Sequence, residues 1–482
     1  MTAQPVVWGS SQLLHFERFP TDLSMASIAV GNLLYDPLFR FDEHGQAQPW
    51  LVKQMTQLSA TKYRLSLNDS VHFASGDQLN ATDVLWSLSQ LRRHSDYRAL
   101  FALIQHVVIN DPFTITITLS QPCADFTRRL AYWFVYDRHW SLQKKASRSL
   151  LTSGSGPFRL VENLTGIRSV LTRNINYWHP DNEGNISQLT VVPIRHEQTR
   201  FSALLGGDID IADHLSGQRF EQLMEIPGLR AKLVNHMRWV GLVFNGKHNH
   251  WLRHEQIRQA ISLGINSQFI SQQLPGSLGE QATQLTFAGS EYYNQSVKNL
   301  YQPDRAYQLL AEQGVDGKGL RLQMIVKQGD HLAIQQTAAI LKTMFERINI
   351  DLQIIWLKPA AFKKALQSCQ GDLFLVAFNR QPDERLGYLQ AMLHGQNDML
   401  AGLHCTPKLA ELDKEYMALQ KGPQVALQLQ KFSAKLASKY YFKPLYWRHQ
   451  LWGIDAAING QAVRNSLGLP YLDKLQVMRQ HR

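Results

Sequence analysis

Cysteine, long apolar runs and runs of one charge are all scarce in this sequence of 482 residues. The cysteines, Cys123, Cys369 and Cys405, include no CxxC pair. This argues against a thiolate zinc site and against a disulfide framework, although one bridge stays open. No window approaches the roughly 18 apolar residues of a transmembrane helix. The N-terminus lacks a charged segment followed by an apolar one, so we expect no signal peptide within this chain.

Signatures of several enzyme and DNA-binding classes are absent as well. There is no GxSxG elbow, although composition alone leaves a Ser/His/Asp triad open. There is no HExxH sequence of a metallohydrolase. No helix-turn-helix or zinc finger is readable, and we find no internal repeat.

What the sequence does contain is typical of a large globular protein. Hydrophobic residues make up 44% and charged residues 18%, and the length suits two or three domains. The net charge of +11 is spread along the chain, which favours ordinary surface charge over a nucleic-acid or membrane-binding patch. The 11 Trp and 16 Tyr suit packing, or stacking on a polar ligand.

The predicted helices and strands alternate irregularly, so the chain is not a plain βαβ series. Apolar periodicity predicts a helix that runs into a short strand within 24–41, and a helix that begins at the N-cap candidate Asn80 or Thr82 and reaches about residue 91. It also predicts a helix from 196 that Gly206–Gly207 ends as a C-cap, and helices at 253–265, 303–313 and 331–348. Alternation predicts strands at 62–67, 71–73, 107–119 (a hairpin), 167–172, 188–194, 208–212, 239–245, 319–327, 350–357, 372–378 and in the tail from 443.

Three motifs invite a chemical reading. "GDIDIAD" holds Asp208, Asp210 and Asp213, but no nucleophile, base or metal partner accompanies them, so we interpret them as structural. "GSGPF" at 154–158 is Gly-rich but leads into a strand, which favours a tight crossover over a phosphate-binding loop. "KHNHWLRH" contains His248, His250 and His254 at a spacing that metals use, yet a polar loop entering a helix is the better interpretation.

Several segments resemble, in one order, the family 5 extracellular solute-binding proteins that serve peptide and nickel ABC importers. They are "GNLLYDPLFRFDEHGQAQPWLVKQM", "YRLSLNDSVHFASGDQLNATDVLWSL", "GSGPFRLVEN", "TRNINYW", "LLGGDIDIAD", "LVFNGKHNHWLRHEQIRQAISLGIN" and "GDLFLVAFN". The resemblance spans about residues 24–470. It implies that Phe73 is buried, that Gly76 lies in a turn, and that Asp83 lies in a helix's first turn, where the dipole favours an acid.

The segments 91–131 and 443–468 resemble more closely the solute-binding half of SgrR-type regulators, which sense sugar-phosphate stress. Those regulators carry an N-terminal DNA-binding domain that this chain does not contain, so DNA is a partner only through such a domain. The resemblance implies a cytoplasmic location if the chain is SgrR-like. It implies a periplasmic one, with an ABC permease as partner, if the chain is an importer component.

The resemblance also suggests ligand-binding residues. Peptide-binding members use an aspartate of a "DYPDP"-like segment for the peptide's amino terminus, whereas "FNRQPDERLGY" here keeps only Asp383, beside Arg380 and Arg385. This favours an anionic or neutral polar ligand. The full predicted set is Asn245, Asn379, Arg380, Asp383, Tyr446, Trp447, Arg448, Trp8 and Phe16.

The predicted fold class is α/β, a multi-lobe fold like that of the type II, family 5 periplasmic binding proteins, with a hinge near 240–246 and 444–453. Lobe I comprises 1–41, 154–240 and 454–482, lobe II is an inserted accessory lobe at 42–153, and lobe III comprises 241–453. We predict a non-enzymatic monomer without cofactor or metal that closes around a sugar phosphate or short peptide in an inter-lobe cleft. The regulator-like sensor is the first hypothesis, the importer component the second, and a metal-dependent hydrolase the third.

Overall fold

The computed structural model of the chain forms two compact units, Met1–Val234 with Leu451–Arg482, and Asn235–Gln450. It describes residues 4–16, 22–42, 45–123, 126–143, 150–179, 184–274, 278–288, 290, 292–315, 319–328, 332–379, 405, 415, 419, 425–459 and 471–478. The chain passes between the units within two strands, β14 (Leu229–Phe244) and β19 (Phe442–Asp455). The three-lobe division and the hinge stay predictions.

The first unit is built around a mixed sheet. Its strands follow the order β10 (Phe158–Leu164), β11 (Arg168–Arg173), β12 (Ile186–Pro193), β1 (Gln4–Ser10), β13 (Ile211–Leu215) and the end of β19. The strands β12, β1 and β13 run parallel to one another. The helix α6 (Glu197–Gly206) connects β12 to β13 and ends at Gly207, whose φ of 77° is the left-handed cap that the double glycine predicts.

The same unit holds a separate antiparallel sheet, with strand order β5 (Val52–Ser59), β6 (Lys62–Leu67), β8 (Thr114–Leu119) and β7 (Ile104–Asp111). The helix α2 (Ala81–Leu91) begins with a capping box between Asn80 and Asp83, which confirms the predicted start. Phe73 is buried and Gly76 has a φ of 96°, as the resemblance implied. Further elements are α1 (Met25–Leu34), α3 (Ser95–Leu100), α4 (Phe126–Leu130), α5 (Arg138–Leu142) and α7 (Gln218–Glu225), with the short strands β2 (Asp36–Pro37), β9 (Phe134–Val135), β3 (Phe39–Phe41) and β4 (Ala47–Pro49).

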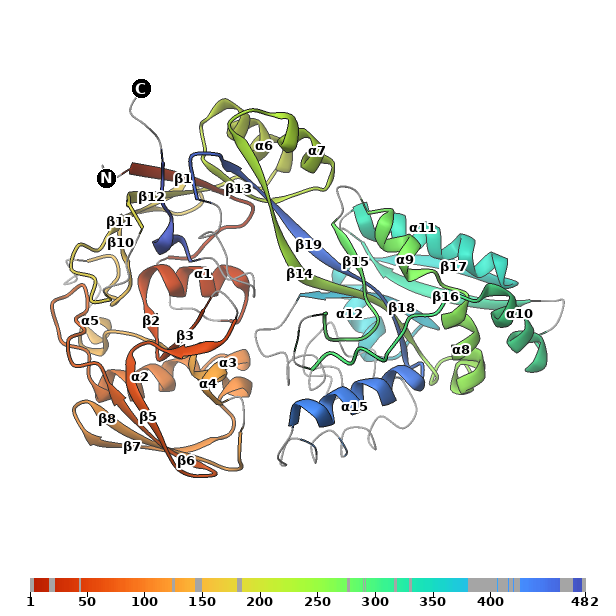
Figure 1. Cartoon of the computed structure of the whole chain (residues 1–482), viewed down its shortest axis with the longest axis horizontal. Helices are drawn as coiled ribbons and strands as arrows, with labels where there is room; N and C mark the ends of the chain where they lie inside the picture. The colour runs from red at the N-terminus through yellow and green to blue at the C-terminus, as the bar shows by residue number, and fades with distance from the viewer. Residues whose placement is uncertain are drawn as a thin grey trace. The chain divides into compact units, whose positions relative to one another are not determined.

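The second unit is a sheet covered on both faces. Its strands are β19, β14, β18 (Leu373–Asn379), β16 (Leu320–Lys327) and β17 (Ile350–Leu357), and β15 (Gly279–Gln281) pairs with β19. Its helices are α8 (Glu255–Leu263), α9 (Ser267–Gln272), α10 (Pro303–Glu312), α11 (Leu332–Arg347), α12 (Pro359–Gln367) and α15 (Val425–Ser438) (Figure 1). The bounds of β17 match the predicted strand.

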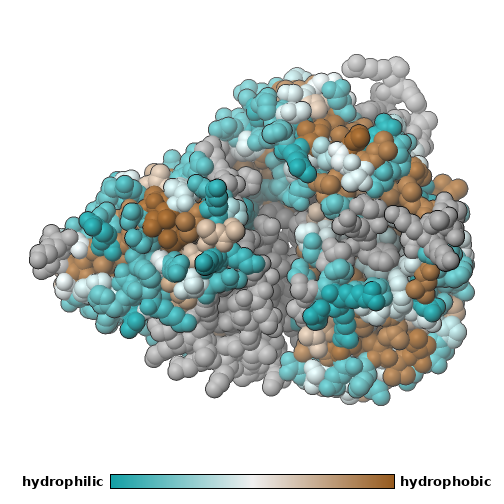
Figure 2. Space-filling model, turned by 180° about the vertical axis from the view of Figure 1, so that it is seen from behind, coloured by the Kyte–Doolittle hydropathy of each residue, from teal (hydrophilic) through white to brown (hydrophobic). Residues whose placement is uncertain are grey.

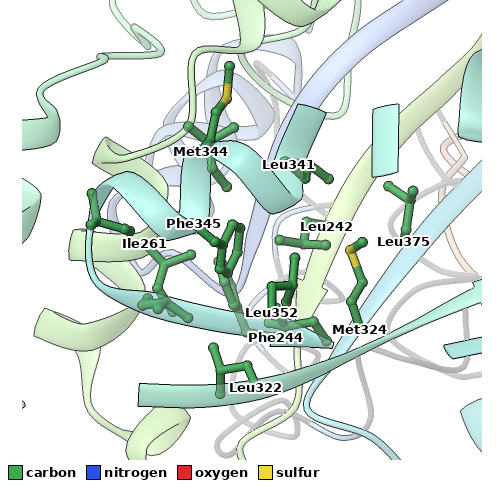
Figure 3. Packing of buried hydrophobic residues seen from close by; sticks show 14 of the residues in the cluster. Leu242, Phe244, Ile261, Leu322, Met324, Leu341, Met344, Phe345, Leu352 and Leu375 are labelled. Carbon is green, nitrogen blue, oxygen red and sulfur yellow. The ribbon is translucent and has the colours of Figure 1, made fainter. Parts of the chain in front are cut away.

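Alternation along the central strands assigns side chains to two separate cores of this unit. On β14, Leu242 and Phe244 enter the core shared with α8, α10 and α11, whereas Trp239 and Val243 enter the core shared with α12 and α15. Figure 3 shows the first core, where Met344 and Phe345 of α11 lie above strand residues such as Leu352. A period of two with both faces apolar is what a sheet buried on both sides requires.

One face of the molecule carries a mixture of hydrophilic and apolar residues (Figure 2). On the face seen in Figure 2, hydrophilic residues separate the apolar patches from one another. None of the helices in the described ranges is long and apolar enough to cross a membrane.

Candidate solute-binding residues and their surroundings

Asn245, the first predicted ligand contact, follows β14 and is completely buried. Its side-chain amide donates to the carbonyls of Cys369 at 2.8 Å and Gly371 at 2.7 Å. Its side-chain oxygen accepts from the amides of Lys247 and His248 at 3.0 and 3.1 Å. Because these bonds use both donors and both lone pairs, Asn245 acts as a junction between two loops here. Contact with a ligand stays a prediction.

The residues predicted on β19 divide between the two cores. Tyr446 is completely buried and its hydroxyl lies 3.0 Å from the Thr337 hydroxyl. Trp447 is buried in the opposite core, with Phe287 at its edge. Arg448 is half-buried and pairs with Gly279 of β15. Of these three side chains, that of Arg448 has the most solvent access.

The remaining predicted contacts differ in what the structure describes. Trp8 is buried on β1 and packs against Trp452, with ring centroids 5.7 Å apart. Phe16 is fully buried beside a cavity of about 10 Å³, which has room for no more than one water molecule. Asn379 ends β18, and its backbone lies opposite Arg238. Arg380 and Asp383 lie outside the described residues.

Two of the three acids of "GDIDIAD" bind backbone amides. Asp210 accepts from the Val7 amide of β1 at 2.7 Å, and Asp213 accepts from the Ser11 amide at 2.7 Å. Ile209 and Ile211 are buried. The geometry supports the structural interpretation, because the carboxylates fasten β13 to β1 and to the loop after it.

A cluster of polar groups lies at the carboxyl end of β1. His214 has a φ of 48°, and its Nδ1 lies 2.9 Å from the Ser11 hydroxyl and 3.3 Å from Asp213. Since Ser11 and Asp213 approach the same ring nitrogen, the arrangement is not a Ser/His/Asp relay, in which they use opposite nitrogens. Burial alone would raise the pKa of Asp213, but the hydrogen bond and charge of His214 and the Ser11 amide together hold it below its ordinary value.

Arg200 holds the backbone of this cluster in place through hydrogen bonds to its carbonyls. Its buried guanidinium donates to the carbonyls of Asp213 and His214 at 2.8 and 3.0 Å, and to that of Ile194 at 2.5 Å. These bonds hold the ends of β12 and β13 beside the end of β1. The strand order reverses at β1, because α6 carries the chain from β12 on one side to β13 on the other. In open α/β sheets the carboxyl ends of strands at such a switch point are where ligands bind.

A second polar centre, which no sequence pattern indicated, is the buried carboxylate of Asp36. It accepts hydrogen bonds from the indoles of Trp50 and Trp178, from the Tyr177 hydroxyl and from the Ser155 hydroxyl. Burial raises its pKa, and the bonds from Trp178, Trp50 and Tyr177 oppose that rise only in part. Asp36 therefore joins segments far apart in the chain.

The two remaining motifs, "GSGPF" and "KHNHWLRH", lie in loops and turns of the structure. In "GSGPF", a Cβ on Gly154 would lie 1.9 Å from the Leu34 carbonyl oxygen, so the glycine permits a close approach to the end of α1. His250 and His254 flank the 3-10 helix Trp251–Arg253, and His248 binds Asp372 at 2.8 Å. Within the described part of the chain, no group of three or more His, Cys, Asp or Glu is placed to hold a metal ion.

A family model, described as bacterial extracellular solute-binding proteins, family 5 Middle, matches residues 46–399. The nickel-binding periplasmic protein of Escherichia coli is 26% identical over 346 residues, which cover 67% of this chain and 64% of that protein. The peptide transport periplasmic protein SapA of Salmonella typhimurium is 24% identical over 392 residues, which cover 75% and 71%. The HTH-type transcriptional regulator SgrR of Photorhabdus laumondii is 27% identical over 160 residues, which cover 32% and 28%.

Solved structures share the fold over nearly the whole chain. NikA from Brucella suis in complex with Fe(III)-EDTA has a TM-score of 0.85 at 19% identity and covers 98% of this chain and 99% of that one. The ABC transporter-associated periplasmic binding protein DppA from Helicobacter pylori, in complex with the peptide STSA, has a TM-score of 0.78 at 17% identity, with 99% of each chain covered. The predicted fold class is confirmed.

Proposed function

Because this chain belongs to the family 5 bacterial extracellular solute-binding proteins, we propose that it is the solute-binding component of an ABC importer of the peptide or nickel type. The observation that supports this most is the extent of the relatives' match. The peptide transport protein SapA aligns with 75% of the chain, whereas the SgrR regulator aligns with 32%. This favours the second hypothesis over the regulator-like sensor. The relatives are binding proteins, which agrees with the expectation of binding rather than catalysis.

The proposed ligand is a small polar solute, and the proposed partner is the importer's permease. The cluster at the carboxyl end of β1 supplies a candidate contact within the first unit. The ring of His214 is oriented through Nδ1, while its side chain is 36% exposed. Its Nε2 is the ring atom left for a solute, and it donates or accepts according to the tautomer and protonation state of the ring.

A thermal-shift screen tests the function and the ligand class together. Purified protein is heated with short peptides, sugar phosphates and a nickel chelate, each in separate wells. A solute at a hundred times its Kd stabilises the folded state by about 2.7 kcal/mol. For a unit of this size, this raises Tm by roughly 5 °C or more. Shifts with peptides alone would reject the anionic-ligand preference, and no shift with any of the three classes would count against the importer proposal.

The variant His214→Asn tests the candidate contact with the solute that the screen finds. Asparagine tolerates the left-handed backbone conformation at this position, so the fold is retained while the ring is lost. We expect calorimetric titration to show at least a tenfold weaker Kd, which corresponds to about 1.4 kcal/mol. His106→Asn on the exposed face of β7 is the matched control and should leave the Kd unchanged. Equal affinities in the two variants would show that His214 does not contact the solute.

The SgrR-like sensor stays a second candidate, since a third of the chain matches such a regulator. The genomic reading frame decides between the two. A DNA-binding domain encoded in frame ahead of this segment would support the regulator, and an export signal there would support the importer.

A further inference from the structure

Three chain segments meet at Asn245 in the second unit. The first is the loop 245–248, whose amides bind the Asn245 side chain. The second is the turn 369–372, in which the carbonyls of Cys369 and Gly371 accept from that side chain. The backbone carbonyl of Asp372 also accepts from the backbone N–H of Asn245 at 2.9 Å. The third is Cys405, whose carbonyl accepts from the Lys247 amide at 3.2 Å.

A disulfide joins two of these segments. Cys369 and Cys405 are bonded, with their Cα atoms 5.5 Å apart, inside the range that such bonds require. Cys405 is fully buried. Cys369 has a φ of 54° and Gly371 a φ of 116°, so the turn that carries the bond uses conformations that need support from their surroundings. The third cysteine of the sequence, Cys123, is buried in the other unit and is not part of a disulfide.

We propose that the Cys369–Cys405 disulfide is the covalent brace of the Asn245 junction, and that the protein therefore matures in an oxidising compartment. The inference rests on the proposed function, because an importer's solute-binding component works outside the cytoplasm, where such bonds persist. The hydrogen bonds at Asn245 hold the loop 245–248 to the turn. The disulfide adds a covalent link to Cys405, which lies 36 residues along the chain from Cys369 and also accepts a hydrogen bond from the Lys247 amide.

The bond forms by thiol–disulfide exchange. One cysteine thiolate attacks the disulfide of a dithiol oxidase, and the second cysteine thiolate displaces the oxidase from the mixed disulfide. The two cysteines lose two electrons and two protons, and the oxidase is reduced to its dithiol.

Counting thiols tests whether the bond forms. The full chain is exported to the periplasm of a bacterial host, trapped with maleimide at lysis under denaturing conditions, and weighed intact. We expect one tag without reductant, on Cys123, and three tags after reduction. Three tags without reductant would overturn the proposal. One tag in a host without the periplasmic dithiol oxidase would overturn the exchange route described above.

Thermal unfolding tests whether the bond braces the junction. Complete reduction, confirmed by three tags, should lower Tm by about 5 to 10 °C, because a constraint on the unfolded chain is lost. The variant Cys369→Ser/Cys405→Ser should start from that lower Tm and show no response to reductant. Cys123→Ser is the control and should respond like the original protein. An unchanged Tm after full reduction would reject the brace.

The two proposals fail in different ways. Three free thiols together with a solute in the thermal-shift screen would reject the brace and leave the solute-binding function in place. An intact disulfide with no solute found would reject the function and leave the brace.

Discussion

Replacing Asp36 with alanine is expected to lower the free energy of unfolding of the first unit by about 3 to 5 kcal/mol. Asp36 is 2% exposed and receives four hydrogen bonds. Alanine removes the acceptor and leaves these donors beside a cavity. Each buried donor without a partner costs about 1 to 3 kcal/mol. The indoles and the tyrosine are half-buried, so water restores part of this loss.

The variant Asp36→Asn makes the test specific to hydrogen bonding. Trp50 and Tyr177 donate to one carboxylate oxygen, at 2.8 Å each, and Trp178 and Ser155 donate to the other at 3.0 and 2.9 Å. An asparagine has one oxygen, so its amide nitrogen must face one of these donor pairs. We therefore expect Asp36→Asn to recover only part of the stability that Asp36→Ala loses.

Denaturant titration followed by tryptophan fluorescence measures both variants. Asp351→Ala is the matched control, because the Asp351 side chain is 62% exposed and pairs with an exposed Arg321. Exposed ion pairs contribute about 0 to 1 kcal/mol, so the control should change little. If Asp36→Ala and Asp351→Ala destabilise the protein equally, Asp36 does not organise this unit.

Asp36 also shows where prediction from the sequence ends. Its acceptor role depends on Ser155, Tyr177 and Trp178, which lie 119, 141 and 142 residues away. No local pattern marks such a centre. The family resemblance includes several of these residues in its matching segments, but it did not indicate that their side chains meet.

Elements with strong local signals were predicted well. The strand β17 and the capped start of α2 follow from alternation and from the Asn80 cap, both of which act within a few residues. β1 and β5 were missed. β5 is largely exposed along its length, so its sequence lacks a clear apolar alternation and it depends on pairing with β6. The strand predicted at 71–73 forms only a bridge between His72 and Gln78, because local turn bonds occupy its backbone.

The candidate site was predicted least completely. Asn245 was chosen as the end of a strand at a crossing, and its position after β14 is correct. Its partners at 369–371 lie more than a hundred residues away, so the junction was invisible in the sequence. His214 could have been found only by combining the strand order with its place at the end of β13. The pattern "GDIDIAD" indicates the strand but not its neighbours.

Replacing Lys443 with methionine is expected to stabilise the second unit at pH 6. Lys443 is 3% exposed at the start of β19. Its ammonium donates to the side-chain oxygen of Asn299, and it forms no ion pair with a carboxylate of the described residues. Burial lowers the pKa of Lys443 from 10.5 to about 7. Methionine has a similar length and no charge to desolvate.

The sign of the pH dependence follows from this shift. The folded pKa lies below the unfolded one, so the unfolded chain binds more protons between about pH 7 and 10.5. The original protein therefore gains stability as the pH rises through this window, and the full cost of burying the charge applies below pH 7. With about 1.4 kcal/mol for each pKa unit, that cost is on the order of 4 to 5 kcal/mol.

Methionine also leaves the Asn299 oxygen without this donor, which costs about 1 to 3 kcal/mol. We therefore expect Lys443→Met to be roughly 1 to 4 kcal/mol more stable than the original protein at pH 6. The advantage should shrink as the pH rises above 7 and change sign between about pH 8 and 10, where the remaining cost of burying the charge falls below that of the lost hydrogen bond. Urea unfolding of both proteins at several pH values gives this difference directly. Lys364→Met on the exposed face of α12 should show no such trend, and a pH-independent difference for Lys443→Met would mean that the buried amine does not titrate in this range.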